Sequence, residues 1–159
     1  MMAFIAPCLY AFGGSFAFAL VFNIPKNKLL FSAIGGFLGQ LTYVLFQFII
    51  ASDVALYFLA TITISFYAEM MARVTKTPTT LYLAVALIPL VPGGGVYYTM
   101  LYLLGGSIDL GITTGLHTLG ISGALAMGIV LVSSSINLIR KVMLSGRRKY
   151  KRPAVPWKK

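Results

Sequence analysis

Charge is scarce in this sequence, and negative charge most of all. Only 10% of the 159 residues are charged, with three Asp and Glu against thirteen Lys and Arg, while 58% are apolar. Soluble proteins carry roughly 25% charged residues. This chain therefore has too few polar residues to cover its apolar core in water. Its single cysteine, Cys8, excludes an intrachain disulfide. We therefore predict an all-α integral membrane protein.

Groups for acid–base or metal chemistry are also few. His117 is the one histidine, and the acids are scattered along the chain. The sequence has no HExxH motif, no Walker loop, no Ser/His/Asp set and no Cys/His cluster. We expect neither an enzyme nor a protein that holds a cofactor or a metal.

Five segments are long and apolar enough to cross a bilayer, which takes about 20 residues. We expect them to be helices, because an open sheet would leave unpaired backbone groups in hydrocarbon. The first could be taken for a signal peptide, but no positive charge precedes it, so we expect a retained span. The predicted spans are Phe4–Phe22, Leu29–Ile50, Val54–Ala72, Leu81–Leu104 and Ile112–Ile139.

The basic residues predict the orientation. They fall between spans one and two, between spans three and four, and after span five. Five spans with a cytoplasmic C-terminus place every Lys and Arg on one side, opposite Asp53 and Asp109, so the positive-inside rule predicts N-out, C-in. A charge of +10 in short loops and a tail favours anionic lipid over nucleic acid as the partner. We expect a five-helix transmembrane domain over residues 1–144 and a disordered basic cytoplasmic tail over 145–159.

The fourth predicted span is interrupted near its middle. Prolines remove backbone donors and glycines add unwanted freedom, and breaks at this depth survive only where protein or a wet cavity satisfies the backbone. Transporters bind substrates at such breaks, and a half-helix starting near Gly93 would attract a carboxylate. The alternative is a kink for packing. The predicted substrate-binding residues here are Pro89, Pro92, Gly93, Gly94, Gly95, Tyr97 and Tyr98.

Polar and small residues mark three other spans. In the second, Gly35 and Gly39 form a close-packing motif, and one helix face carries Gly36, Gln40, Tyr43 and Gln47. This polar face either lines a substrate path or joins helices. In the third, Glu69 continues a stripe begun by Thr61 and Ser65 and is the only acid inside a predicted span.

Glu69 and Arg73 are spaced i, i+4, so Glu69 is either a proton or substrate gate or half of an interfacial ion pair. His117, in the fifth span, is a further candidate for coupling or gating. It lies in a small-residue surface suited to a partner helix, formed by Gly111, Gly115, Gly120, Gly123, Ala124 and Gly128.

Four short motifs occur together along the chain: Phe22-Asn23-Ile24-Pro25, Pro78, Ile88-Pro89-Leu90-Val91-Pro92-Gly93 and Tyr97-Tyr98-Thr99-Met100. From about Phe16 to Lys141 the sequence resembles the threonine/serine exporter (ThrE) family, and within it the small C-terminal-half subunits of the YjjB-like type. Of the residues above, only the Pro89–Gly95 motif is carried over from this resemblance.

The resemblance implies a subunit of a secondary exporter in the bacterial inner membrane, driven by an ion gradient. Its partner would be a larger YjjP-like membrane subunit. The substrate would be a small carboxylate, which is threonine or serine in one branch and a succinate-like dicarboxylate in the split-subunit branch. Two alternatives stay open, namely a non-transporting scaffold subunit and a self-assembled oligomeric pore.

Overall fold

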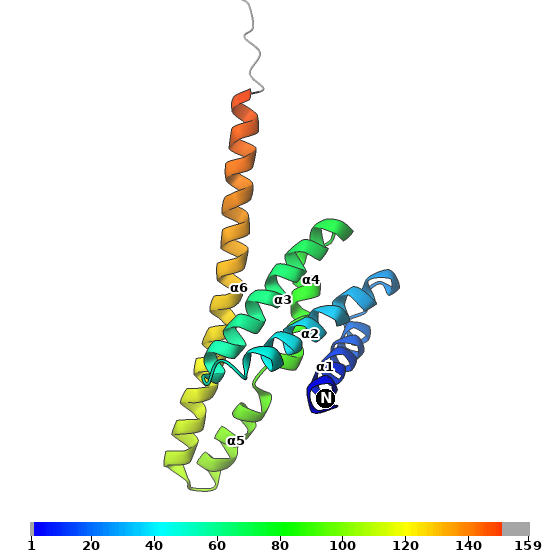
Figure 1. Cartoon of the computed structure of the whole chain (residues 1–159). Helices are drawn as coiled ribbons and strands as arrows, with labels where there is room; N and C mark the ends of the chain where they lie inside the picture. Colours follow the sequence, from blue (N-terminus) through cyan, green and yellow to red (C-terminus); the bar gives the residue numbers. More distant parts are fainter. Residues whose placement is uncertain (1, 151–159) are drawn as a thin grey trace, which may run out of the picture.

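The computed structural model describes the backbone of residues 2–150 and the side chains of residues 5–142. Within this range the chain is helical, with short connections and no strand, which confirms the predicted all-α class (Figure 1). The elements are α1 (Met2–Val21), α2 (Lys26–Phe46), α3 (Asp53–Thr75), α4 (Thr79–Leu87), the short 3-10 helix η1 (Ile88–Leu90), α5 (Gly93–Leu104) and α6 (Ile108–Tyr150).

All five predicted segments are helical, but length and composition support fewer spans. α2, α3 and the described part of α6 are each long and apolar enough to cross a membrane. α4 with η1 and then α5 would make a fourth span, bent by 50° at the break. The described part of α1, Ile5–Val21, is apolar but shorter. The structure thus has three or four candidate spans, and the five-span count and the orientation stay predictions.

α2 is the central helix of the packed region because its glycines allow three neighbours to approach. A Cβ on Gly36 would lie 2.9 Å from the Ser15 Cβ of α1, and one on Gly39 would lie 2.6 Å from the Ile64 Cγ1 of α3. A Cβ on Gly35 would lie 2.8 Å from the Cβ of a residue of α4. Such distances are too short for real side chains, so the predicted close-packing motif is confirmed.

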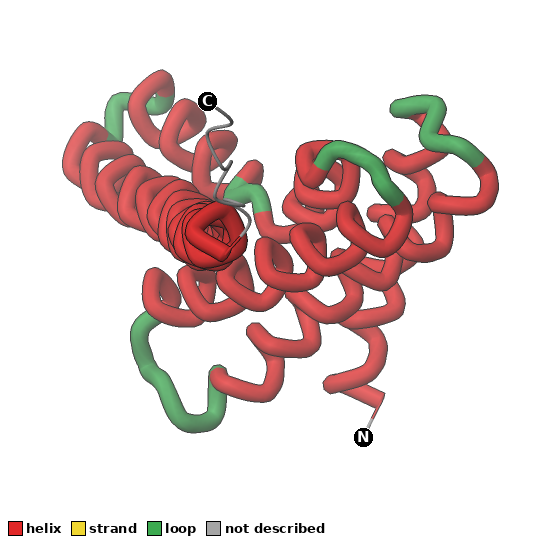
Figure 2. The backbone as a smooth tube through the Cα atoms, turned by 90° about the horizontal axis from the view of Figure 1, so that it is seen from above, coloured by secondary structure: helices red, strands yellow, loops and turns green. Residues whose placement is uncertain are grey.

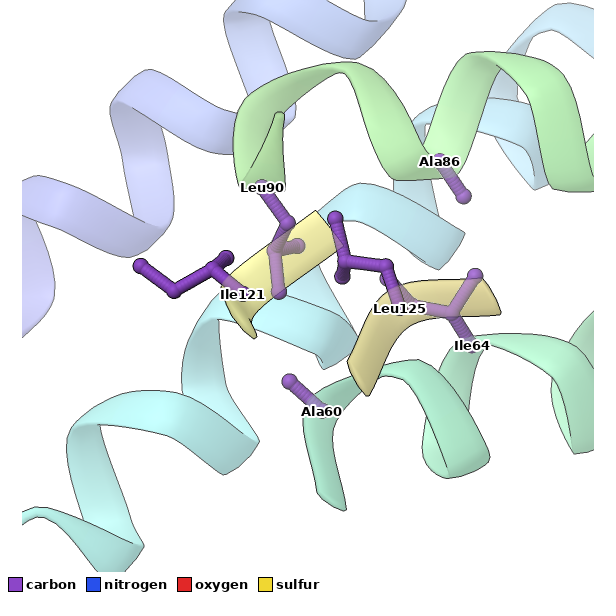
Figure 3. Packing of buried hydrophobic residues seen from close by; sticks show 6 residues of the cluster. All are labelled: Ala60, Ile64, Ala86, Leu90, Ile121 and Leu125. Atoms are coloured by element: carbon purple, nitrogen blue, oxygen red, sulfur yellow. The ribbon is translucent and has the colours of Figure 1, made fainter. Parts of the chain in front are cut away.

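The main apolar core lies where α3, α4, η1 and α6 meet (Figure 3). Leu90, the last residue of η1, is 2% exposed and stands immediately before the break. The broken span is therefore anchored on its α4 side by burial of apolar surface. The six buried residues of this core are Ala60, Ile64, Ala86, Leu90, Ile121 and Leu125.

The two basic loops predicted to share a membrane side do lie at one end of the bundle. The Lys28 Nζ donates a hydrogen bond of 2.8 Å to the Thr77 Oγ1, which joins the start of α2 to the α3–α4 loop. The Thr77 and Thr75 hydroxyls are 2.8 Å apart, and Tyr82 of α4 donates to Thr75. This network closes one end of the bundle with polar contacts.

α6 is much longer than the span predicted within it. It has 43 residues and extends well beyond the other helices (Figure 1). Seen nearly end-on in Figure 2, α6 lies at one side of the bundle, where it packs on α3 and α5. The backbone of residues 145–150, at the start of the predicted tail, continues this helix. Residues 151–159 of the predicted tail lie outside the described residues.

Candidate functional site: the broken span and two polar clusters

The break between η1 and α5 is a tight turn set by its prolines. Pro89 is the second residue of η1, whose closing hydrogen bond runs from the Val91 N–H to the Ile88 carbonyl at 3.2 Å and needs no N–H from Pro89. Pro92 has φ −77° and ψ 56°, and the Gly93 N–H donates to the Val91 carbonyl at 2.7 Å. These values describe an inverse γ-turn. α5 then begins at Gly93, as the sequence predicts.

The start of α5 has two backbone donors without acceptors. The Gly93 N–H is used in the turn, and the Val96 N–H donates to the Pro92 carbonyl at 3.2 Å. Between them, the N–H groups of Gly94 and Gly95 make no hydrogen bond to any described residue. Free donors combined with the positive end of a helix dipole favour an anion such as a carboxylate.

These donors lie at the open surface of the chain and not in a closed cavity. Gly93 and Gly94 are exposed, and a Cβ on either would meet nothing within 4 Å. No residue of α5 is buried. Tyr97 and Tyr98 are 62% and 50% exposed, with their rings 5.3 Å apart in an edge contact. The described residues of this chain therefore cover one side of this candidate site and leave the facing side open.

α5 is held in place by small residues at its contact with α6. A Cβ on Gly95 would lie 3.1 Å from the Thr118 Cγ2, and one on Gly115 would lie 3.1 Å from the Thr99 Cγ2. Gly111 packs in the same way against Leu103. Much of the small-residue surface predicted on this helix thus serves its own chain. Farther along α6, Gly128 packs against Thr61 of α3, Gly120 meets only Val54, and Gly123 faces open space.

The three polar residues predicted to line a path from α2 do not share one environment. Gln40 is half-buried, next to the glycine that packs on Ile64. Tyr43 packs beside the main core, with its ring 5.1 Å from that of Tyr57. Gln47 is exposed and lies just after the last residue of the helix. Their role in substrate binding stays a prediction.

Glu69 and Arg73 form an ion pair near the end of the bundle that carries the basic loops. The Arg73 Nη2 is 3.3 Å from the Glu69 Oε2, and the two side chains are 56% and 16% exposed. This is the geometry of the interfacial pair, one of the two readings of the sequence, and a gating role stays a prediction. Along the same stripe, Thr61 and Ser65 are buried, and the Ser65 Oγ has no partner among the described residues.

His117 pairs with Asp53, an acid for which the sequence predicts only a place on the side opposite the basic residues. The His117 Nε2 lies 3.7 Å from the Asp53 Oδ2, at the end of the bundle opposite the basic loops. Asp53 also acts electrostatically on Tyr43 and Tyr57. Nothing in the sequence connects Asp53 with His117. The one available signal was that both fall at the predicted outer end.

A groove lies at the basic end, away from the break. It has a volume of about 370 Å³ and is mostly apolar. The residues that carry the family resemblance at the start of α2 and α4 meet here, including Asn23 in a left-handed conformation with φ 53°. The lining residues are Phe22, Asn23, Ile24, Pro78, Thr80, Leu81 and Ala84. Among the described residues, no cluster of three or more His, Cys, Asp and Glu could hold a metal.

Comparison with known proteins gives one informative result. The family described as Threonine/Serine exporter, ThrE, matches residues 7–135. No curated protein and no solved structure matches the chain. The matched range contains the break, its tyrosines, the Glu69–Arg73 pair and the Asp53–His117 pair, and it covers most of the chain. The chain therefore belongs to the threonine/serine exporter (ThrE) family.

Proposed function

We propose that this chain is one subunit of a secondary exporter of small carboxylates. Family membership supports threonine/serine exporter-type transport. The observation that supports the carboxylate is the pair of free N–H groups on Gly94 and Gly95, at the positive end of a half-helix. Threonine, serine and succinate-like dicarboxylates all carry the group that this site would bind, so the site does not select among them.

The open side of the break supports a partner subunit. Backbone donors at membrane depth cannot face lipid, which offers no acceptor, and must meet protein or an aqueous cavity. Within the described residues nothing covers Gly93 or Gly94. We propose that a larger YjjP-like subunit covers this side in the bacterial inner membrane, and that substrate binds between the two chains. The exposed Tyr97 and Tyr98 would then line the shared cavity.

The topology proposed for this subunit is five spans, N-out and C-in. The shared position of Lys28 and Thr77 supports placing both basic loops on the cytoplasmic side. A bend of 50° lets α5 continue across the membrane after α4, because a re-entrant loop would have to reverse direction. Alternating access would move α5 relative to the core behind Leu90.

Replacement of Pro92, Gly93 and Gly94 by alanine tests the proposal. Alanines favour a continuous helix, which would place the free N–H groups in regular hydrogen bonds. We expect export from cells to be lost while the amount of protein in the membrane stays unchanged. Gly123→Ala is the matched control, because Gly123 also faces open space but lies far from the break along α6. Normal export by the triple variant would exclude the break as the binding site.

The same variants separate transport from the two alternatives. For a scaffold subunit, changes at the break would alter assembly with the larger chain but not the choice of substrate. For a pore formed by this chain alone, the purified protein in vesicles would leak solutes without a gradient and without a partner. Substrate-selective, partner-dependent flux that the triple variant loses would support the exporter subunit.

A further inference from the structure

A polar cluster joins three helices at the end of the bundle opposite the basic loops. His117 of α6 and Asp53 of α3 are 3.7 Å apart, with side chains 51% and 52% exposed, so the described residues do not enclose the pair. The rings of Tyr43 of α2 and Tyr57 of α3 pack against each other, and both tyrosines interact electrostatically with the Asp53 carboxylate. Three ionisable side chains from α2, α3 and α6 thus face Asp53, namely Tyr43, Tyr57 and His117.

The cluster is connected to the break through the residue that follows His117 on α6. Thr118 follows His117 on α6, is 6% exposed, and packs so tightly on Gly95 that a Cβ there would lie 3.1 Å from its Cγ2. Neighbouring helix residues point in directions about 100° apart. At this level α6 therefore contacts α3 through one residue and α5 through the next. A shift of α6 relative to α3 would be transmitted to Gly95, which carries one of the two free donors.

We propose that Asp53 and His117 form a proton-binding latch that sets the position of α5 against the core. This inference rests on the proposed function, because it describes how the same site is controlled. Histidine is the side chain that changes charge between pH 5 and 8. With one proton taken from water, the imidazolium attracts the Asp53 carboxylate and holds α6 against α3. When that proton returns to water, the attraction is lost and the end of α6 that packs on α5 moves with it, while Ile121 and Leu125 stay in the core.

A distance measurement tests the latch without any need for transport. Spin labels would be placed at Leu104→Cys on α5 and Tyr10→Cys on α1, which are 86% and 79% exposed, in a Cys8→Ser background. The distance between labels would be measured at pH 5 and pH 8 in the full chain in lipid nanodiscs. We expect a pH-dependent shift that is lost in His117→Gln and in Asp53→Asn.

Asp109→Asn is the matched control, because Asp109 is an acid in the first turn of α6 just as Asp53 is in the first turn of α3. It should keep the pH-dependent shift. An unchanged distance in the wild type, or a shift that survives both latch variants, would overturn the proposal. Two variants are used because each removes one partner by a different change, so a folding defect in one does not decide the result.

The latch and the proposed function can fail separately. Export measured across the same pH range should lose its pH dependence in Asp53→Asn and in His117→Gln, while the triple alanine variant at the break loses export at every pH. If the distance between the labels shifts with pH but the triple alanine variant exports normally, the latch is supported and the binding site at the break is excluded. If the distance does not change with pH but the triple alanine variant loses export, only the latch is excluded.

Discussion

Two glycine clusters that look alike in the sequence have opposite surroundings in the structure. Gly36 and Gly39 of α2 are buried, and a side chain on either would overlap a neighbouring helix. Gly93 and Gly94 at the start of α5 are exposed, and a side chain there would touch nothing. Glycine in α2 lets helices approach closely, whereas glycine in α5 leaves the backbone accessible. The glycine face of α2 is therefore packed against other helices, whereas the first turn of α5 is open.

We expect the largest effect on stability when one glycine is replaced by leucine, and the two clusters should respond differently to this change. In Gly39→Leu the new side chain would collide with Ile64 and lie 3.1 Å or less from the Leu90 Cδ1, so α3 and η1 would have to move. Overpacking of this kind costs about 1–3 kcal/mol or more. We expect Gly39→Leu to lower the yield of monodisperse protein in detergent strongly, whereas Gly94→Leu leaves it near wild type.

Equal losses in the two leucine variants would contradict the comparison, because they would mean that the start of α5 is packed as tightly as α2. Retention of full export by Gly94→Leu would instead contradict a role for the accessible backbone. A leucine there would stand beside the two free donors.

An intermediate effect is expected at the one glycine of α5 that is in contact. In Gly95→Val the side chain would push against Thr118 and separate α5 from α6. The cost is expected to be about 1–3 kcal/mol, but confined to the contact between these two helices. Hydrogen exchange should therefore rise in α5 and stay unchanged in α2 and α3. Faster exchange throughout the bundle would show that α5 is part of the main core.

The smallest effect on stability is expected at the ion pair of α3. Arg73 is more than half exposed, and helical i, i+4 pairs contribute about 0.3–0.5 kcal/mol. Glu69→Gln should therefore barely change thermal unfolding. Export distinguishes the two roles of Glu69, because an interfacial pair would leave export near wild type and a gate would not. Arg73→Gln is the matched variant, and it removes the partner without changing the carboxylate.

Local signals in the sequence were sufficient for much of this architecture. Long apolar runs placed every helix within a few residues, apart from the far end of α6, and prolines with glycines placed the start of α5 at Gly93. These features depend on neighbouring residues alone. The same holds for the ion pair between Glu69 and Arg73, one helical turn apart.

Contacts between distant segments could not be predicted from these local patterns. Asp53 and His117 meet because α3 packs on α6, and no periodicity encodes that pairing. The sequence also indicated a partner helix for the glycines of α6, but not that α5 and α3 of the same chain are partners for several of them. Exposure at the break could not be predicted either, since it depends on which helices fail to cover α5.

The length of α6 turns small movements into large ones. At 1.5 Å per residue, its 43 residues make a rod of about 65 Å, roughly twice the thickness of the hydrocarbon layer. A rotation of about 10° around one end of such a rod displaces the other end by about 11 Å. A small tilt of α6 where it touches α5 would thus move the segment that extends past the rest of the bundle by many ångströms.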